Sequence, residues 1–294
     1  MSESVIHVSE LTRRFGAKTA LDSVSLSMPR GAVYGLVGAN GAGKTTLIKH
    51  LLGLLRAESG SVRVFGRDPV ADPVAVLSRI GYLSEENDLP GWMRVDELIR
   101  YSRAFYPAWD DAYAETLQKT FALDPGAKIR SLSKGQKARA GLLVALAYRP
   151  ELLVLDEPSS GLDPIVRRDI LGAVIRTIAD EGRTVLFSSH LLEEVEQVAD
   201  HVTMISRGSI ALSAPLDSIR ESHRSVTVRF AESRPEPRPF ADVLRWDGGG
   251  QDWTALVRGD TGELHAAAAG WGAHVVAERV PSLDEIFVAY AGSH

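Results

Sequence analysis

The sequence contains no cysteine, which excludes disulfide bonds and thiolate metal sites and fits a reducing compartment. Its longest apolar run is about seven residues, at 142–148, well short of the roughly 20 that a membrane-spanning helix needs. Residues 1–5 have neither the basic nor the apolar region of an export signal, so we expect none. Basic residues are outnumbered by acidic ones, for a net charge of −5, and we expect no nucleic acid partner. Any membrane role must therefore come through a partner.

A glycine-rich loop stands near the start of the chain. It follows the apolar run Val33–Val37 and precedes a helical pattern that begins at Thr46. Such a loop binds phosphate, because its backbone N–H groups turn inward and the helix N-terminus adds partial positive charge. Lys44 supplies a full positive charge, and the hydroxyl of Thr45 can bind Mg²⁺. We predict a nucleoside triphosphate site made of Gly38, Ala39, Asn40, Gly41, Ala42, Gly43, Lys44, Thr45 and Thr46.

Two adjacent carboxylates end a second apolar run. Residues 152–155 are all apolar, and Asp156 and Glu157 follow directly. In a parallel sheet this strand end lies beside the phosphate loop. Because side chains alternate along a strand, the two carboxylates point in different directions. We expect Asp156 to hold Mg²⁺ through its water shell and Glu157 to orient and deprotonate an attacking water.

The remaining pattern predicts an α/β fold with a P-loop core. Four continuous apolar runs are typical of parallel strands buried on both faces: 33–37, 152–155, 184–187 and 202–205. Helical patterns follow at 166–178, behind Asp163 and Pro164, and at 191–198. The 294 residues are enough for one large domain and a smaller one.

Two segments depart from this α/β pattern. Residues 87–130 are helical in character and rich in aromatic side chains, so we expect a helical insertion with a small core of its own. The aromatic residues of this segment are Trp92, Tyr101, Phe105, Tyr106, Trp109 and Phe121. The chain after residue 214 predicts strands at 225–230, 253–258 and 274–277, a turn at 247–250 and a helix from Glu263. Ser282 and Glu285 have the spacing of a capping box that begins a last helix. This tail is typical of a small α+β domain.

A short motif upstream of the acidic strand connects these features. Residues 132–136 read Leu-Ser-Lys-Gly-Gln and are followed by a helix-like run. Here the chain resembles the ATPase subunits of ATP-binding cassette (ABC) transporters, whose signature is LSGGQ. The resemblance covers about residues 3–214. It includes Phe15 as the adenine-stacking aromatic, Asp163 of the D-loop (160–163) and His190 as the switch histidine.

The resemblance implies an ABC ATP-binding domain over residues 1–214 and a C-terminal accessory α+β domain over 215–294. The first has a RecA-like core, an antiparallel β subdomain and a helical subdomain at about 87–150. In this family ATP lies between the phosphate loop of one cassette and the signature of another. Ser133, Lys134, Gly135 and Gln136 are thereby expected to act in trans, with the hydroxyl of Ser133 and the backbone N–H of Gly135 facing the γ-phosphate. His190 is expected to act in catalysis beside Glu157.

The implied function is an ATPase, with ATP and Mg²⁺, that energises transport by a separate integral membrane permease. The required partners are a second cassette, as a homodimer or a sister subunit, and the permease. The aromatic helical insertion is the surface expected to contact the permease, with Trp92 and Met93 as candidates, and core packing is the alternative for each. The expected location is cytoplasmic, peripheral on the inner face of the cell membrane. The tail is similar to the accessory domains of exporters only at residues 281–287. Cargo and transport direction stay open, because the permease determines them.

Two positions depart from the family pattern. Lys134 replaces the first signature glycine, so that position cannot require a positive φ. Its charge either attracts phosphate or faces solvent. Glu85 stands where the family usually has glutamine, and we expect it to be a ligand of Mg²⁺, although it brings negative charge toward the γ-phosphate.

Two other functions are compatible with a phosphate loop. A soluble ABC ATPase that acts on ribosomes or nucleic acid usually has two cassettes or a long coiled coil, and this chain has one cassette and no heptad run. A regulatory nucleotide-binding module without turnover would not need Glu157 and His190. The transporter ATPase is the interpretation that uses all the motifs.

Overall fold

A six-stranded sheet forms the centre of the first part of the chain. The structure, a computed structural model, describes residues 4–86, 88–163, 165–168, 170–172, 182–237 and 240–292. Among these, the sheet has the order β5-β6-β7-β3-β8-β9, with β5 at Ile80–Leu83, β6 at Leu152–Asp156, β7 at Thr184–Ser189, β3 at Val33–Val37, β8 at His201–Ser206 and β9 at Ser209–Pro215. The pairings from β5 to β8 are parallel. The four apolar runs thus form buried parallel strands, and the α/β fold class is confirmed.

A second, antiparallel sheet packs with the first helix against this centre. Three strands of the described chain form it in the order β2-β1-β4, with β1 at Ser4–Phe15, β2 at Lys18–Pro29 and β4 at Ser59–Val64. Helix α1 (Lys44–Leu51) contributes Leu47, Ile48 and Leu51 to a hydrophobic cluster shared with both sheets. The position of α1 is therefore fixed by burial of its apolar side, which also fixes the loop before it.

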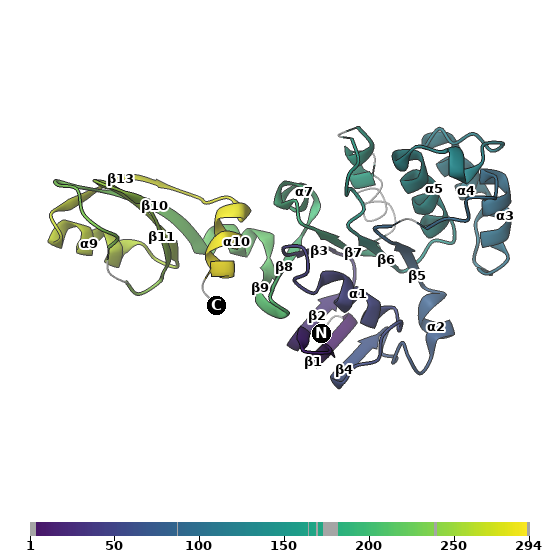
Figure 1. Cartoon of the computed structure of the whole chain (residues 1–294), viewed down its shortest axis with the longest axis horizontal. Coiled ribbons are helices and arrows are strands. Elements are labelled where there is room, and N and C mark those ends of the chain that lie inside the picture. The colour runs from purple at the N-terminus through teal and green to yellow at the C-terminus, as the bar shows by residue number, and fades with distance from the viewer. Residues whose placement is uncertain are drawn as a thin grey trace. The chain divides into compact units, whose positions relative to one another are not determined.

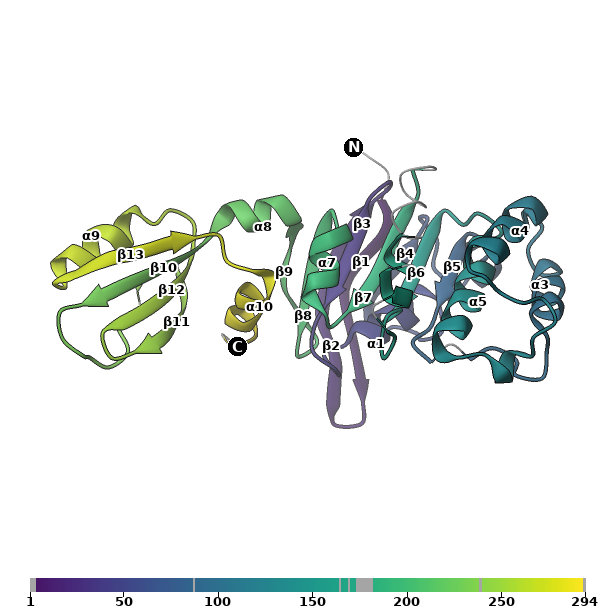
Figure 2. The ribbon, with the colours of Figure 1, turned by 90° about the horizontal axis from the view of Figure 1, so that it is seen from above.

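Helices gather beyond strand β5 (Figures 1 and 2). They are α3 (Val95–Arg103), α4 (Asp111–Thr120), the 3₁₀ helix η1 (Ile129–Ser131) and α5 (Lys134–Leu146), with α2 (Pro73–Leu77) shortly before β5. The helical character expected for this region is confirmed. The expected aromatic core is only partly right, because Trp92, Tyr101 and Phe105 are exposed at 71%, 52% and 62%, whereas Phe121 is buried. Aliphatic side chains such as Leu98, Leu117 and Ile129 are buried here instead.

The last part of the chain forms a sheet of its own. Within its described residues four strands follow the order β11-β12-β10-β13, with β10 at His223–Phe230, β11 at Val243–Gly249, β12 at Asp252–Arg258 and β13 at Ala273–Arg279. Helix α8 (Leu216–Ser222) precedes the sheet, and α9 (Gly262–Gly270) packs on one face through Leu264 and Ala268. The expected turn at 247–250 comes later, since β11 continues to Gly249 and turn residues are 250–251.

The final helix, α10 (Leu283–Gly292), begins with the capping box that the sequence predicts. The N–H of Ser282 donates to Glu285 Oε2 at 2.9 Å, and the N–H of Glu285 donates to Ser282 Oγ at 3.3 Å. The two reciprocal bonds satisfy backbone donors that a helix start leaves without partners.

The chain divides into two compact units, Met1–Ile210 and Ala211–His294; the sequence suggests a division after residue 214. None of the helices in the described ranges is long and apolar enough to cross a membrane. Pro164 and the part of the expected helix at 173–178 lie outside the described residues.

Candidate functional site

The phosphate loop leads from β3 to an uncapped helix start. Gly43 is the N-cap of α1, makes no side-chain cap and has φ 119°, a conformation that favours glycine. A Cβ built on Gly43 would lie 2.7 Å from the carbonyl oxygen of Ala20, so the loop also needs glycine for space. The first turn of α1 contains no acidic residue. Free N–H groups and an unopposed helix dipole at this end favour an anion.

Lys44 brings a buried positive charge to the same place. Its side chain is 6% exposed, and its Nζ donates to the carbonyl oxygen of Gly38 at 2.6 Å and forms an ion pair with Glu157 Oε1 at 3.0 Å. A buried ammonium must be paired to be tolerated. Lys44 is therefore held by a backbone oxygen of the loop and by the carboxylate of Glu157, which directly follows β6.

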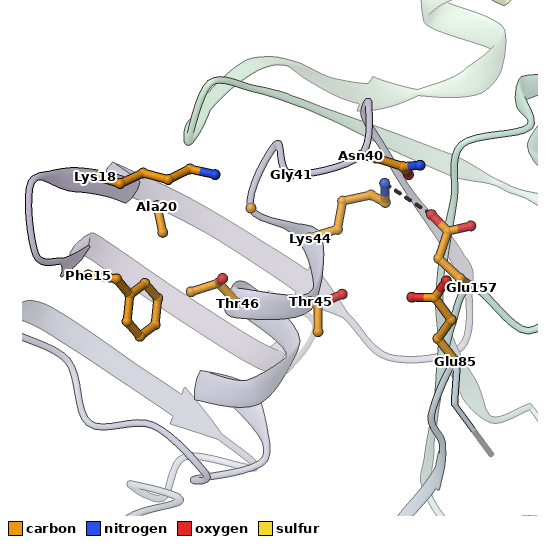
Figure 3. A pocket seen from close by; sticks show the side chains of 11 residues that line it. Phe15, Lys18, Ala20, Asn40, Gly41, Lys44, Thr45, Thr46, Glu85 and Glu157 are labelled. Carbon is orange, nitrogen blue, oxygen red and sulfur yellow. Dashed lines mark ion pairs between the residues drawn. The ribbon is translucent and has the colours of Figure 1, made fainter. Parts of the chain in front are cut away.

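A cavity of about 280 Å³ opens beside the loop (Figure 3). The carboxylates of Glu85 and Glu157 enter from one side, Thr45 and Thr46 lie at the start of α1, and Phe15 lies at the other end. Phe15 is 47% exposed, and the guanidinium carbon of Arg13 lies 4.8 Å from its ring centroid. The lining residues are Phe15, Lys18, Ala20, Asn40, Gly41, Gly43, Lys44, Thr45, Thr46, Glu85 and Glu157.

Glu157 lies at the centre of a short chain of charged contacts. Oε1 faces Lys44, and Oε2 lies 2.7 Å from His190 Nδ1. The carboxylate is 6% exposed and the imidazole 38%. Glu157 also has φ 47°, a strained conformation for a residue with a side chain. Because Glu157 is also buried between Lys44 and His190, this strain supports the hypothesis of a functional role.

Asp156 is held from the neighbouring strand. Ser188 Oγ donates to Asp156 Oδ1 at 2.7 Å and accepts from the N–H of Glu157 at 2.9 Å. One serine thus fixes both acidic residues. Burial, with the nearby Asp156 and Glu86, raises the pKa of Tyr82 to about 12. The phenol therefore stays neutral near this negatively charged strand end.

Glu85 and Lys134 approach a neighbouring loop from two sides. This loop, residues 158–163, follows Glu157, and its Ser160 Oγ donates to Glu85 Oε1 at 3.4 Å. A methyl group built on Gly161 would lie 2.6 Å from Lys134 Nζ. Glu85, Lys134, Glu157 and Ser160 all line a second cavity of about 280 Å³. The charge of Lys134 therefore lies against residues 158–163 of its own chain.

The signature residues form a helix start. Ser133 is the N-cap of α5, its Oγ accepts from the N–H of Gln136 at 3.2 Å, and its N–H donates to Gln136 Oε1 at 2.9 Å. Gly135 is buried, and a Cβ there would lie 2.7 Å from Val166. None of Ser133, Lys134, Gly135 and Gln136 lines the cavity beside the phosphate loop.

Asp163 also caps a helix. Its Oδ1 accepts from the N–H groups of Ile165 and Val166, both at 3.0 Å. The described residues 165–168 and 170–172 are helical, as the sequence predicts. Asp163 does not line the cavity beside the phosphate loop.

Comparison with known proteins assigns the family. The family model described as ABC transporter matches residues 21–160. The daunorubicin resistance ATP-binding protein DrrA3 of Streptomyces coeruleorubidus is 36% identical, over 75% of this chain and 71% of that protein. The ATP-binding protein NatA of Bacillus subtilis is 34% identical, over 77% of this chain and 96% of that one. This chain belongs to the ABC transporter family. It is an ATPase subunit of that family.

Solved structures agree with this assignment of the cassette. An ATP-binding subunit of an ABC transporter matches with a TM-score of 0.68 and 28% identity, over 74% of this chain and 92% of that chain. A bacterial ABC transporter cassette solved as a dimer has a TM-score of 0.65 at 20% identity, over 72% and 98% of the two chains. The second comparison supports the fold alone.

The polar groups of this cassette fit the binding of ATP and Mg²⁺. The uncapped start of α1 and the ammonium of Lys44 are complementary to a triphosphate. The hydroxyl of Thr45 and the carboxylates of Asp156 and Glu85 are the hard oxygen donors that Mg²⁺ prefers. The predicted nucleotide-binding and catalytic residues Phe15, Lys44, Glu157 and His190 therefore lie around one centre. The signature residues do not line the cavity beside the phosphate loop, and Lys134 lines the second cavity.

Sequence reasoning missed several residues of this cassette's site. Lys18 and Ala20 line the cavity from β2, and Ser188 holds both carboxylates. The only signal in the sequence was proximity, since Lys18 follows Phe15 by three positions and Ser188 precedes His190 by two.

Proposed function

We propose that this chain is the ATP-hydrolysing subunit of a transporter, in which ATP drives two cassettes together and thereby energises a separate membrane permease. The proposal is carried mainly by Glu157, a buried carboxylate with Lys44 on one oxygen and His190 on the other. Binding of nucleotide alone does not require a buried base and its positioned imidazole. A regulatory module without turnover is therefore disfavoured.

Hydrolysis begins, on this proposal, with an exchange of partners at Lys44. A triphosphate in the loop competes with Glu157 Oε1 for the ammonium, which now lies 3.0 Å away. Glu157 is then free to take a proton from the attacking water, while His190 stays on Oε2 at 2.7 Å and orients the carboxylate. Mg²⁺, when bound, would neutralise part of the negative charge of the phosphates.

The second half of each ATP site is assigned to another cassette. Ser133 and Gly135 lie at the N-terminus of α5, a 13-residue helix, and do not line the chain's own nucleotide cavity. A helix start of this length suits a phosphate presented from outside. The partner cassette is either a second copy or a sister subunit.

The permease contact is assigned to exposed aromatic side chains of the helical region. Trp92 is 71% exposed, and Tyr101 of α3 forms an edge-to-face pair with Phe105, which follows that helix, with centroids 5.0 Å apart. Aromatic residues are enriched where proteins bind each other. Met93, the neighbour of Trp92, is 5% exposed and belongs to the core. The chain would thus lie on the cytoplasmic face of the membrane, held there by the permease.

The ATPase part is tested with Glu157→Gln. The variant should hydrolyse ATP at least about 10²-fold more slowly than the wild type, because it lacks the general base. ATP binding should persist, and an ATP-dependent dimer should accumulate. Phosphate release and gel filtration with ATP measure the two effects. Equal low rates in both proteins would favour the regulatory module.

The transport part is tested by purifying this chain from membranes. A permease encoded by the neighbouring gene should co-purify with it. A Trp92→Ala, Phe105→Ala variant should lose co-purification and keep its basal ATPase rate, because neither residue lines the nucleotide cavity. Undiminished co-purification of the variant would place the permease contact elsewhere.

A further inference from the structure

A buried carboxylate lies behind the catalytic centre and takes no part in the chemistry described above. Glu194 of α7 (Leu192–Val198) is 3% exposed. A buried charge is tolerated only where several groups compensate it. The partners of Glu194 therefore indicate why this position carries a charge.

The first partner belongs to the loop at 158–163. Ser159 Oγ donates to Glu194 Oε2 at 2.7 Å, and Ser159 is 1% exposed. Ser159 lies within the turns of this loop, since the carbonyl of Glu157 accepts from the N–H of Ser160 and the carbonyl of Ser159 accepts from the N–H of Leu162, both at 3.1 Å. A hydrogen bond to an ionised acceptor is among the stronger ones in proteins. Glu194 therefore anchors the loop close to where it leaves Glu157.

The second partner is next to the switch histidine. Ser189 Oγ donates to the same Oε2 at 3.1 Å and accepts from the N–H of Leu191 at 3.0 Å. Ser189 immediately precedes His190, whose imidazole contacts Glu157. One carboxylate oxygen thus joins the loop that follows Glu157 to the segment that carries His190.

The third partner neutralises the charge from the outer side. Arg167 Nε lies 3.0 Å from Glu194 Oε1, and its side chain is 34% exposed. Arg167 lies in the helical residues that Asp163 caps, and its N–H donates to the carbonyl of Asp163 at 3.0 Å. Glu194 therefore contacts Ser159 near the start of residues 158–163 and pairs with Arg167 in the helical residues that follow their end.

We propose that Glu194 is a positioning residue for ATP hydrolysis. Through Ser159 and Ser189 it fixes the loop at 158–163 relative to the Glu157 and His190 pair. Glu194 does not line the cavity beside the phosphate loop. Its loss should therefore lower kcat rather than ATP affinity, because small displacements of catalytic groups cost rate.

The test compares Glu194→Gln with Glu193→Gln. The two glutamates are neighbours on α7, and Glu193 is exposed. We expect kcat of Glu194→Gln to fall about tenfold or more, with KM for ATP changed by less than about threefold. Glu193→Gln should match the wild type. Equal kcat in all three proteins overturns the proposal, and a wild type without ATPase activity overturns the proposed function on which it rests.

Two further variants separate positioning from folding and from simple neutralisation of Arg167. Ser159→Ala removes one hydroxyl and no charge, and should lower kcat in the same direction with an unchanged Tm. A wild-type kcat there contradicts the proposal. The double variant Glu194→Gln, Arg167→Met removes both charges and should stay slow. Recovery of the wild-type rate would show that Glu194 only compensates Arg167, which also overturns the proposal.

Discussion

The two units of the chain place their polar side chains differently. In the first unit, the described buried polar residues include Lys44, Asp156, Glu157, Ser188 and Glu194, which are connected through the Glu157 and His190 region, and others such as Thr12 and Ser102 that lie elsewhere. In the described residues of the second unit they are His223 and Ser225 alone. Burying charge costs stability unless the groups are paired. The concentration of buried charge in one unit therefore marks where chemistry takes place.

The second unit keeps its charges at the surface and its aromatic side chains inside. Arg279 and Glu285 form an ion pair whose side chains are 55% and 39% exposed, and such pairs contribute little to stability. Its core contains Phe230, Trp246 and Trp253, with Trp271 packed against it. This unit is thus held by apolar burial, whereas the first unit carries a costly polar centre on a large apolar core.

The largest expected effect tests how far the second unit depends on that core. Phe230 is 3% exposed, and Phe230→Ala should cost about 3 to 5 kcal/mol in the free energy of unfolding of this unit. Tryptophan fluorescence during urea unfolding measures it, because three of the five tryptophans, Trp246, Trp253 and Trp271, lie here. Phe105→Ala, at a 62% exposed position of the first unit, is the control. ATP binding should survive in both; its loss in Phe230→Ala would show that the units are not independent.

A smaller effect is expected from removing one buried charge of the first unit. Lys44→Ala should weaken ATP binding by about 10²-fold, because the ammonium is the cation aimed at the phosphates. Binding of a fluorescent ATP analogue measures this. Lys49→Ala, an exposed lysine on the same helix, should bind normally. Equal affinity of the two variants would mean that the buried charge is structural.

The pH dependence of the second unit should come partly from His223. Burial lowers the pKa of His223 in the folded protein, so only the unfolded chain takes up a proton as pH falls below about 6.5. Stability is complete above that pH and declines below it, by at most about 1.4 kcal/mol per pH unit. Urea midpoints from pH 8 to 5, followed by tryptophan fluorescence, measure the decline. His223→Gln should flatten it, and an unchanged slope would assign the dependence to other groups.

The smallest effect concerns the departure at residue 85. Hydrolysis should survive in Glu85→Gln, while the Mg²⁺ concentration for half-maximal rate shifts several-fold, because a neutral amide is a weaker ligand than a carboxylate. Glu86→Gln is the matched control, since Glu86 lines only the second cavity. A magnesium titration identical to that of the wild type would exclude a metal role for Glu85.

Sequence patterns predicted the parts of the fold that depend on neighbours along the chain. The continuous apolar runs became β3, β6, β7 and β8, and the capping box at Ser282 and Glu285 began α10. Strands β1 and β2 were expected only as part of the antiparallel β subdomain that the resemblance implies, and the bulges in their pairing leave only short stretches of alternation such as residues 24–28. For the exposed Trp92 the sequence left both core packing and a permease contact open, because composition does not show which face a side chain occupies.

The sequence by itself determined that the chain binds a nucleotide, that two carboxylates follow one strand, and that the signature begins a helix. These features are local, because motif spacing and the strand period specify them. Only the tertiary structure decided that Lys44 and His190 reach opposite oxygens of Glu157, and that Glu194 joins Ser159 to Ser189. Those contacts connect residues far apart in the chain, and only the packing of β6, β7, α1 and α7 brings them together.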